Sequence, residues 1–152
     1  MTLQNTITEV IHQRALLADE AVDVVLPNMM DTYSPKDRQV IITPETTTRA
    51  AEHDCMGNPP ASGWKITYQI RVLVRQDENG PHTSVDEDLS TLTAGVYNAI
   101  CGEADWWTMN GNALNAEWTS LEREITELQM AAYQMSLDVY YRTDETNLLN
   151  RR

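Results

Sequence analysis

Few side chains in this chain of 152 residues are suited to metal binding or nucleophilic catalysis, because it has three His and two Cys. A zinc site needs three or four ligands at suitable spacing, and the best starting pair is His53 with Cys55. The other candidate ligands are His12, His82 and Cys101. Since the chain has neither a Cys-x-x-Cys nor a His-x-x-x-His pair, the spacing argues against zinc. A small metal-dependent hydrolase using His53 and Cys55 is therefore the last of the alternatives.

No catalytic or cofactor-binding signature stands out elsewhere. Neither cysteine has a recognisable base beside it, and Cys101 ends a helical apolar stripe, as a small core residue would. The glycines are too few and scattered for a phosphate-binding loop. The acidic run 86–88 lies where a helix is predicted to begin, so capping and the helix dipole explain it. The sequence therefore predicts no enzyme, no metal and no cofactor.

The aromatic residues are the most suggestive feature that is not catalytic. Trp106, Trp107 and Trp118 are three of the four tryptophans and surround a predicted turn at Asn110-Gly111. Aromatic side chains are enriched at protein interfaces, but they also anchor cores. We treat these three as candidate interface residues and leave the core alternative open.

Two amphipathic helices are predicted to support these side chains. The first begins near residue 3, and Thr6 with Glu9 fits a capping box at a slightly later start. Its apolar positions are Leu3, Ile7, Val10, Ile11 and Leu17. The second helix follows a capping box of Ser84 and Glu87 and ends near Gly102. We expect the apolar side of each helix to pack on a sheet.

The strands of that sheet are predicted from alternation. Segments 64–76 and 131–142 alternate apolar and polar residues over most of their length, and two shorter segments, VDVVLP and RQVIIT, are rich in β-branched residues. Segment 113–130 fits a helical period and an exposed strand equally well. Together these elements predict a single α+β domain over residues 1–152, with an antiparallel or mixed sheet and helices packed on one face.

Two segments are expected to be irregular. Residues 44–63 contain three prolines, two glycines and almost no large apolar side chain, which predicts a flexible loop or extended arm. Arg49 and His53 lie in it and become candidate partner contacts if the arm orders on a neighbour. The alternative is a surface insertion without a role. Residues 143–152 are predicted to form a polar C-terminal tail.

The charge of the chain limits its partners. Lys and Arg total 11 against 23 Asp and Glu, so a net charge of -12 would repel a phosphate backbone. No apolar run approaches the roughly 20 residues that span a bilayer, and the first residues do not resemble a signal peptide. We therefore expect no tight nucleic-acid binding, no membrane insertion and reduced cysteines.

The order of elements resembles that of tail-terminator and tail-completion proteins of long-tailed bacteriophages. The likeness rests on an N-terminal helix, the strand WKITYQIRVLVRQ, a central helix, a GNAL turn segment and the closing strand YQMSLDVYYRTDE. Members of that family often end the closing strand with an aromatic residue and an arginine, here Tyr141 and Arg142. The resemblance makes these two residues candidate interface positions.

The resemblance implies a virion protein of the tail or neck that is assembled in the host cytoplasm. Its subunits would form a ring, usually a hexamer, that caps the tail tube, ends its polymerisation and meets neck or connector proteins. DNA would pass through the channel without specific binding, which suits an acidic subunit. A head-tail connector or stopper subunit is the alternative within structural proteins.

Overall fold

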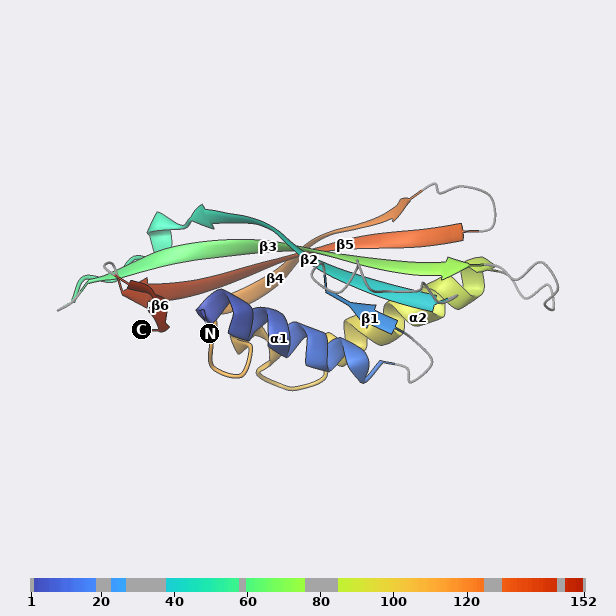
Figure 1. The fold of residues 1–152 in the computed structure, drawn as a ribbon, viewed down its shortest axis with the longest axis horizontal. Helices are drawn as coiled ribbons and strands as arrows, with labels where there is room; N and C mark the ends of the chain where they lie inside the picture. The colour runs from blue at the N-terminus through green and yellow to red at the C-terminus, as the bar shows by residue number, and fades with distance from the viewer. Residues whose placement is uncertain are drawn as a thin grey trace.

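Two long strands form the centre of a twisted sheet in the computed structural model (Figure 1). β3 (Ala61–Arg75) and β5 (Met130–Asp144) pair antiparallel along their whole length. On each strand, every second side chain is buried under the helices, as Ile70 and Leu137 are, both fully inaccessible to solvent. The two long alternating strands expected from the sequence are thus confirmed.

The sheet is mixed and has six strands within the part of the chain that the structure describes. That part comprises residues 2–18, 23–26, 38–57, 60–75, 85–124, 130–144 and 147–151. The remaining strands are β1 (Asp23–Val25), β2 (Arg38–Arg49), β4 (Asn115–Glu124) and β6 (Asn147–Arg151). Their order is β1-β2-β3-β5-β4, with β6 beside β5. β1 runs parallel to β2 and every other pair is antiparallel.

Both helices cover the same face of the sheet, α1 (Leu3–Leu16) beside α2 (Val85–Ile100) (Figure 1). This arrangement confirms the predicted α+β fold class. The expected capping box of Thr6 is wrong, because Thr2 caps α1 by accepting a hydrogen bond from the Asn5 amide at 3.1 Å. The Thr6 hydroxyl instead donates to the Thr2 carbonyl.

The core lies between these helices and the sheet. Ile7 and Ile11 of α1 are fully buried, and the hydroxyl of the buried Tyr68 lies 2.8 Å from that of Thr8. Burial raises the pKa of Tyr68 well above its ordinary value, with a small opposing effect from Thr8. Leu17, expected in the apolar stripe, lies past the end of α1 and is 81% exposed.

Residues 44–63 are not the irregular loop that their composition predicted. β2 continues through Arg49 and β3 begins at Ala61, with a short 3-10 turn, η2 (Ala51–His53), between them. Cys55 pairs with Ala61 in an isolated β-bridge. The second half of β2 is rich in threonine and exposed, so it forms a strand without any apolar alternation to reveal it.

The ambiguous segment 113–130 is a strand where the structure describes it. β4 pairs with β5, and the register shifts between Trp118 and Ser120. The predicted turn before it is confirmed, since Met109, Asn110 and Gly111 all have positive φ angles.

The polar tail predicted for 143–152 is also partly regular, because β5 reaches Asp144 and β6 follows it. Ser84 of the expected second capping box and the expected YSPKD turn lie outside the described residues. Among the described helices, none has the length and apolar character that crossing a membrane requires.

Candidate functional site

The far end of the β2–β3 hairpin gathers three of the predicted site residues, Arg49, His53 and Arg142. Gly63 makes this possible, because a Cβ there would clash with the Ala50 carbonyl oxygen and lie 2.7 Å from the His53 Cβ. The missing side chain lets η2 lie directly against β3, opposite Arg142 on β5. We call Arg49, His53, Asp54, Tyr140 and Arg142 the hairpin cluster.

Both guanidinium groups of the hairpin cluster bind groups within the chain. Arg49 Nη2 lies 2.8 Å from Asp54 Oδ2, and its guanidinium carbon is 5.5 Å from the centroid of the Trp64 ring. Arg142 Nε donates to the His53 carbonyl oxygen. The other carboxylate oxygen of Asp54 accepts from the Gly63 amide at 2.7 Å. These contacts fasten the end of the hairpin.

Tyr140 is held as a neutral hydrogen-bond donor in this cluster. Its ring centroid is 4.8 Å from that of His53, and its hydroxyl donates to Glu117 at 3.1 Å. Desolvation, the hydrogen bond to Glu117 and the negative charges of Glu117, Asp138 and Glu52 raise the pKa of Tyr140 to about 12. Tyr140 therefore carries no charge near neutral pH.

Tyr141 lies on the opposite face of β5 from Tyr140 and Arg142, as strand alternation requires. It is buried, 5% exposed, and burial raises its pKa. With Trp64, Thr47 and the start of α1 it lines a small cavity of about 170 Å³. The predicted aromatic-arginine pair is therefore divided between the core and the other face of the sheet.

The tryptophans form a second group at the edge of the core. Trp118 stacks near Trp106, with ring centroids 6.4 Å apart, and its ring lies 5.0 Å from that of Tyr97. Its indole nitrogen donates to Cys101 Sγ at 3.2 Å. Trp107, on η3 (Trp106–Thr108), is 40% exposed. Of the three predicted tryptophans, Trp107 presents the most ring surface to a partner.

The two free cysteines have different surroundings: Cys101 accepts from the Trp118 indole, and the Cys55 thiol donates to the Met56 carbonyl oxygen. Burial raises the pKa of Cys101, partly opposed by the Trp118 hydrogen bond and the Arg14 charge, so its thiol stays protonated. Cys55 is exposed. Among the described residues, no three His, Cys, Asp or Glu side chains are grouped so that they could hold a metal ion. His82 lies outside those residues.

Arg14 is an important residue that the sequence analysis did not single out. It is 8% exposed, and its Nη1 donates to the Ile100 carbonyl at 3.2 Å and the Trp106 carbonyl at 2.8 Å. Its Nη2 donates to Asn110 Oδ1 at 3.0 Å. The sequence did contain a sign of its burial. Ile7, Ile11 and Arg14 are spaced four and three residues apart, so all three lie on the same side of the helix. Arg14 thus fixes the segment that carries the tryptophans.

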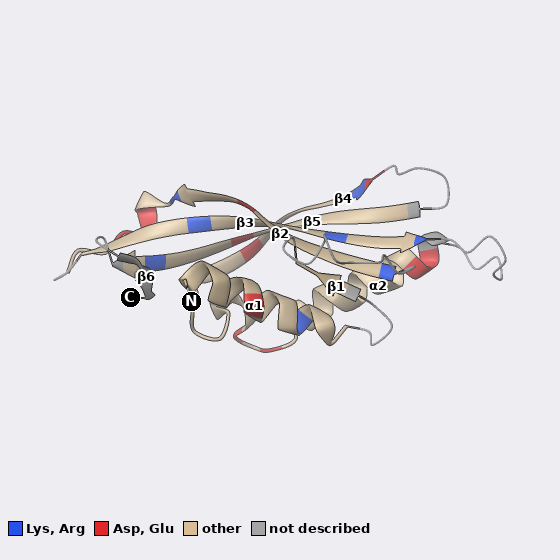
Figure 2. Ribbon diagram, viewed as in Figure 1, with Lys and Arg blue, Asp and Glu red and all other residues tan. Residues whose placement is uncertain are grey.

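The face of the sheet opposite the helices is polar and bonded to itself. Gln69 Oε1 accepts from Gln134 at 2.8 Å and from Ser136 at 2.9 Å, and Gln69 Nε2 donates to Glu45 at 2.7 Å. The Thr67 hydroxyl donates to Asp138 at 2.7 Å. In the view of Figure 2, Lys and Arg positions are scattered along the strands, interspersed with acidic ones. Such a face offers no broad basic surface to a nucleic acid.

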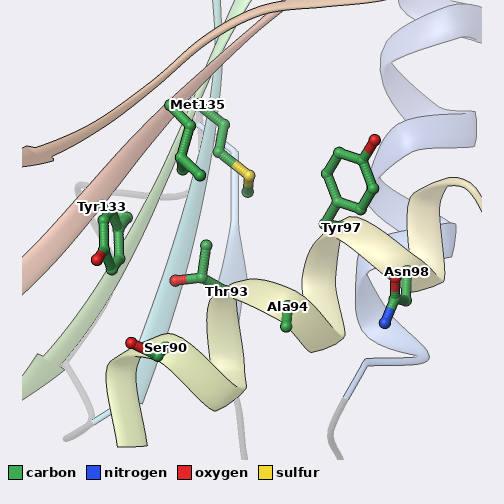
Figure 3. Close-up of a pocket in the computed structure, with 8 residues that line it drawn as sticks. Ser90, Thr93, Ala94, Tyr97, Asn98, Tyr133 and Met135 are labelled. Carbon is green, nitrogen blue, oxygen red and sulfur yellow. The ribbon is translucent and has the colours of Figure 1, made fainter. Parts of the chain in front are cut away.

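An apolar groove opens on the helix-covered face, between α2 and the strands β4 and β5 (Figure 3). Its volume is about 370 Å³. It is lined by Ser90, Thr93, Ala94, Tyr97 and Asn98 of α2 together with Leu121, Tyr133 and Met135. Two of these apolar side chains are largely in solvent, Leu121 at 60% exposed and Tyr97 at 43%. The groove is therefore an exposed apolar surface next to the β4 edge of the sheet.

Comparison with known proteins found similarity among solved structures. No protein-family model matches the chain, and no curated protein matches it. The chain is similar to the PVC sheath/tube terminator of an extracellular contractile injection system, solved by cryo-EM in the extended state. The TM-score is 0.43 and the identity 11%, with 99% of this chain covered. This chain spans 60% of the length of that protein.

Proposed function

We propose that this chain is the subunit of a tail-terminator ring, which caps a tail tube, ends its polymerisation and docks the tail to neck proteins. The observation that carries the proposal is the β4 edge of the sheet. Within the described residues β4 pairs on one side only, with β5, and it borders the groove at Leu121. An open strand edge beside exposed apolar side chains is a typical subunit interface.

Charge on β4 supports a selective contact rather than aggregation. Glu117, Glu122 and Glu124 follow each other along the strand on the polar face. Charged residues on an edge strand discourage pairing with an arbitrary partner. They leave the edge open to a partner of suitable shape and opposite charge, as specific assembly requires.

A ring needs two different surfaces on each subunit, and the groove beside β4 and the hairpin cluster are the two surfaces that we propose for it. In a closed ring one patch meets a different patch on the next copy, unlike the self-matching contact of a two-fold dimer. The two surfaces involve different residues, and Tyr140 and Arg142 of the hairpin cluster lie on the face of β5 opposite Tyr133 and Met135 of the groove. The expected ring is a hexamer, and Arg49, His53, Trp107 and Arg142 remain candidate contact residues.

The polar face of the sheet would suit the lining of a channel through which DNA passes. Its amides and carboxylates bind one another, and the chain as a whole carries a net charge of -12. A polyanion is repelled by such a surface unless a local basic patch exists. The proposal accordingly includes no specific DNA contact, and it places the protein in the tail or neck of a virion.

The test is assembly with the tail-tube protein that the proposal requires in the same genome. The purified subunit is measured by light scattering and negative-stain microscopy, alone and with that tube protein. The proposal predicts a uniform ring that binds one end of the tube and stops its growth. A subunit that stays monomeric at high concentration and leaves tube length unchanged contradicts it.

A further inference from the structure

Met56 is the most exposed large apolar side chain in the described part of the chain, at 99%. It lies at the end of the β2–β3 hairpin and comes directly after Cys55, which is held to β3 by its bridge to Ala61. The backbone next to Met56 is therefore tied to the sheet while the side chain lies in solvent. Contact with a partner would remove this apolar surface from water, which is favourable. We call residues 51–56 the hairpin end.

The groove between α2 and the strands β4 and β5 suits a methionine side chain. Its lining includes the rings of Tyr97 and Tyr133 and the buried side chain of Met135. Methionine is unbranched, fills irregular apolar spaces and makes favourable contacts between its sulfur and aromatic rings. A groove of about 370 Å³ has room for a side chain of this size.

The charges beside the two surfaces have opposite signs. Arg123 of β4 is exposed and lies on the groove side of the sheet, because its partner on β5 lines the groove. Glu52 and Asp54 are exposed at the hairpin end, next to Met56 in the chain. Arg49 offsets the charge of Asp54, so Glu52 is the carboxylate that can approach Arg123. This complementarity favours a contact between the hairpin end and the groove over a contact between two like surfaces.

We propose that the hairpin end of one copy of this chain docks on the groove of the next copy, with Met56 in the groove. One chain cannot make this contact with itself. Ala61, where the hairpin end is bridged to β3, pairs with Asp144 of β5, whereas the groove residue Leu121 pairs with Met135. These two places on β5 are nine positions apart, roughly 30 Å along a strand. In Figure 1 the hairpin end and α2 likewise lie toward opposite ends of the long axis.

The contact gives the ring its direction. The hairpin end and the groove are different parts of the subunit, so each copy inserts Met56 into one neighbour and receives the Met56 of the other. This inference rests on the self-association in the proposed function. It does not require the partner to be a tail tube.

The first test is Met56→Asp, read as mass by light scattering coupled to size-exclusion chromatography. The variant is expected to weaken self-association about tenfold or more, because it places a charge in an apolar contact. Since Met56 is exposed, thermal unfolding of the variant should match wild type. Leu17→Asp, at a side chain that is 81% exposed, is the control that should assemble normally. Assembly of Met56→Asp equal to that of wild type overturns the inference.

The second test locates the contact with a short bis-maleimide cross-linker, which cannot span the two positions within one chain. One variant is Cys55→Ser/Met56→Cys and the other is Cys55→Ser/Leu121→Cys, and both retain Cys101. An equal mixture of the two, combined before assembly, is expected to give covalent dimers on a denaturing gel, whereas each variant alone stays monomeric. Both cysteines in one chain are expected to give a ladder up to the size of the ring. A mixture without cross-linked dimers, or equal amounts of dimer from either variant alone, overturns the inference.

The outcomes separate this contact from the terminator proposal. Rings that cap a tube but do not form the cross-link overturn the contact and leave the terminator proposal standing. Wild-type protein that assembles, with variants that cross-link as expected, but that does not bind or stop a tail tube supports the contact and overturns the terminator proposal. A wild-type protein that stays monomeric contradicts both.

Discussion

At the scale of single residues, Arg14 shows how a buried cation can serve structure alone. Its guanidinium group donates to the last carbonyl of α2, to Trp106 and to Asn110. A positive charge at the C-terminal end of a helix also interacts favourably with the helix dipole. Arg14 therefore connects α1, α2 and the tryptophan-bearing turn.

Replacement of Arg14 by Met is expected to lower the free energy of unfolding by at least about 2 kcal/mol, because buried acceptors lose their donors. Urea unfolding measures the change. Arg49→Met is the matched control, since Arg49 is 44% exposed in its ion pair with Asp54. Its effect should stay within about 1 kcal/mol. Equal effects of the two substitutions would contradict the assigned role of Arg14.

Tyr140 gives a prediction on ionisation. Glu117→Gln should lower the pKa of Tyr140 from about 12, because the hydrogen bond and charge of Glu117 favour the neutral phenol. The measurement is an NMR pH titration of the tyrosine ring carbons, with Tyr140→Phe to assign the signal. An unchanged pKa would show that the hydroxyl is not bonded to Glu117.

The same shift has a consequence for stability. The folded-state pKa of Tyr140, about 12, lies above its ordinary value of 10.0, so the folded state holds the proton more tightly. The stability contributed by Tyr140 is therefore complete below pH 10 and is lost as the pH rises toward 12.

At the scale of elements, two glycines should respond in opposite ways to the same substitution. Gly63→Ala places a methyl group against Ala50 and His53 and is expected to destabilise by about 1–3 kcal/mol. Gly95→Ala lies inside α2, where the nearest atom to the new Cβ is 3.9 Å away. It should stabilise by about 0.5–1 kcal/mol, since glycine is a poor helix former. Melting temperatures that shift in the same direction would contradict the packing of η2 on β3.

The strands that could be predicted from the sequence are those with one buried and one wet face. In β3 and β5 the apolar side chains of one face pack under the helices, while most side chains of the other face are polar, and this difference produces the alternation. β4 was ambiguous for a physical reason: the bulge between Trp118 and Ser120 sets Trp118 and Leu121 on one face although they are three residues apart. That spacing also fits a helix.

Site residues were harder to predict than elements. The far half of β2 was interpreted as a loop because its side chains are exposed, so Arg49 and His53 were expected on an arm rather than at the end of a hairpin. Which residue of a pair such as Tyr141 and Arg142 is buried depends on strand register. The groove could not be predicted from the sequence, because Tyr97, Leu121 and Met135 belong to three separate elements that only the fold brings together.

At the scale of the whole molecule, the helices cover one face of the sheet (Figure 1), and a polar hydrogen-bond network occupies the other face. The interfaces that we propose are therefore the strand edges and the apolar groove, where the exposed Leu121 and Tyr97 lie. In a closed ring, every subunit contacts a neighbour through both of its interfaces. In an open chain, the two end subunits each leave one interface exposed.

The central claim is that copies of this chain close into a ring that ends a tail tube. The most direct measurement is negative-stain microscopy of the tube protein polymerised with and without this subunit, with tube lengths and end densities counted. The account predicts ring-shaped caps on one end and shorter tubes as subunit is added. Tubes of unchanged length with bare ends, from a subunit that remains monomeric in solution, would contradict it.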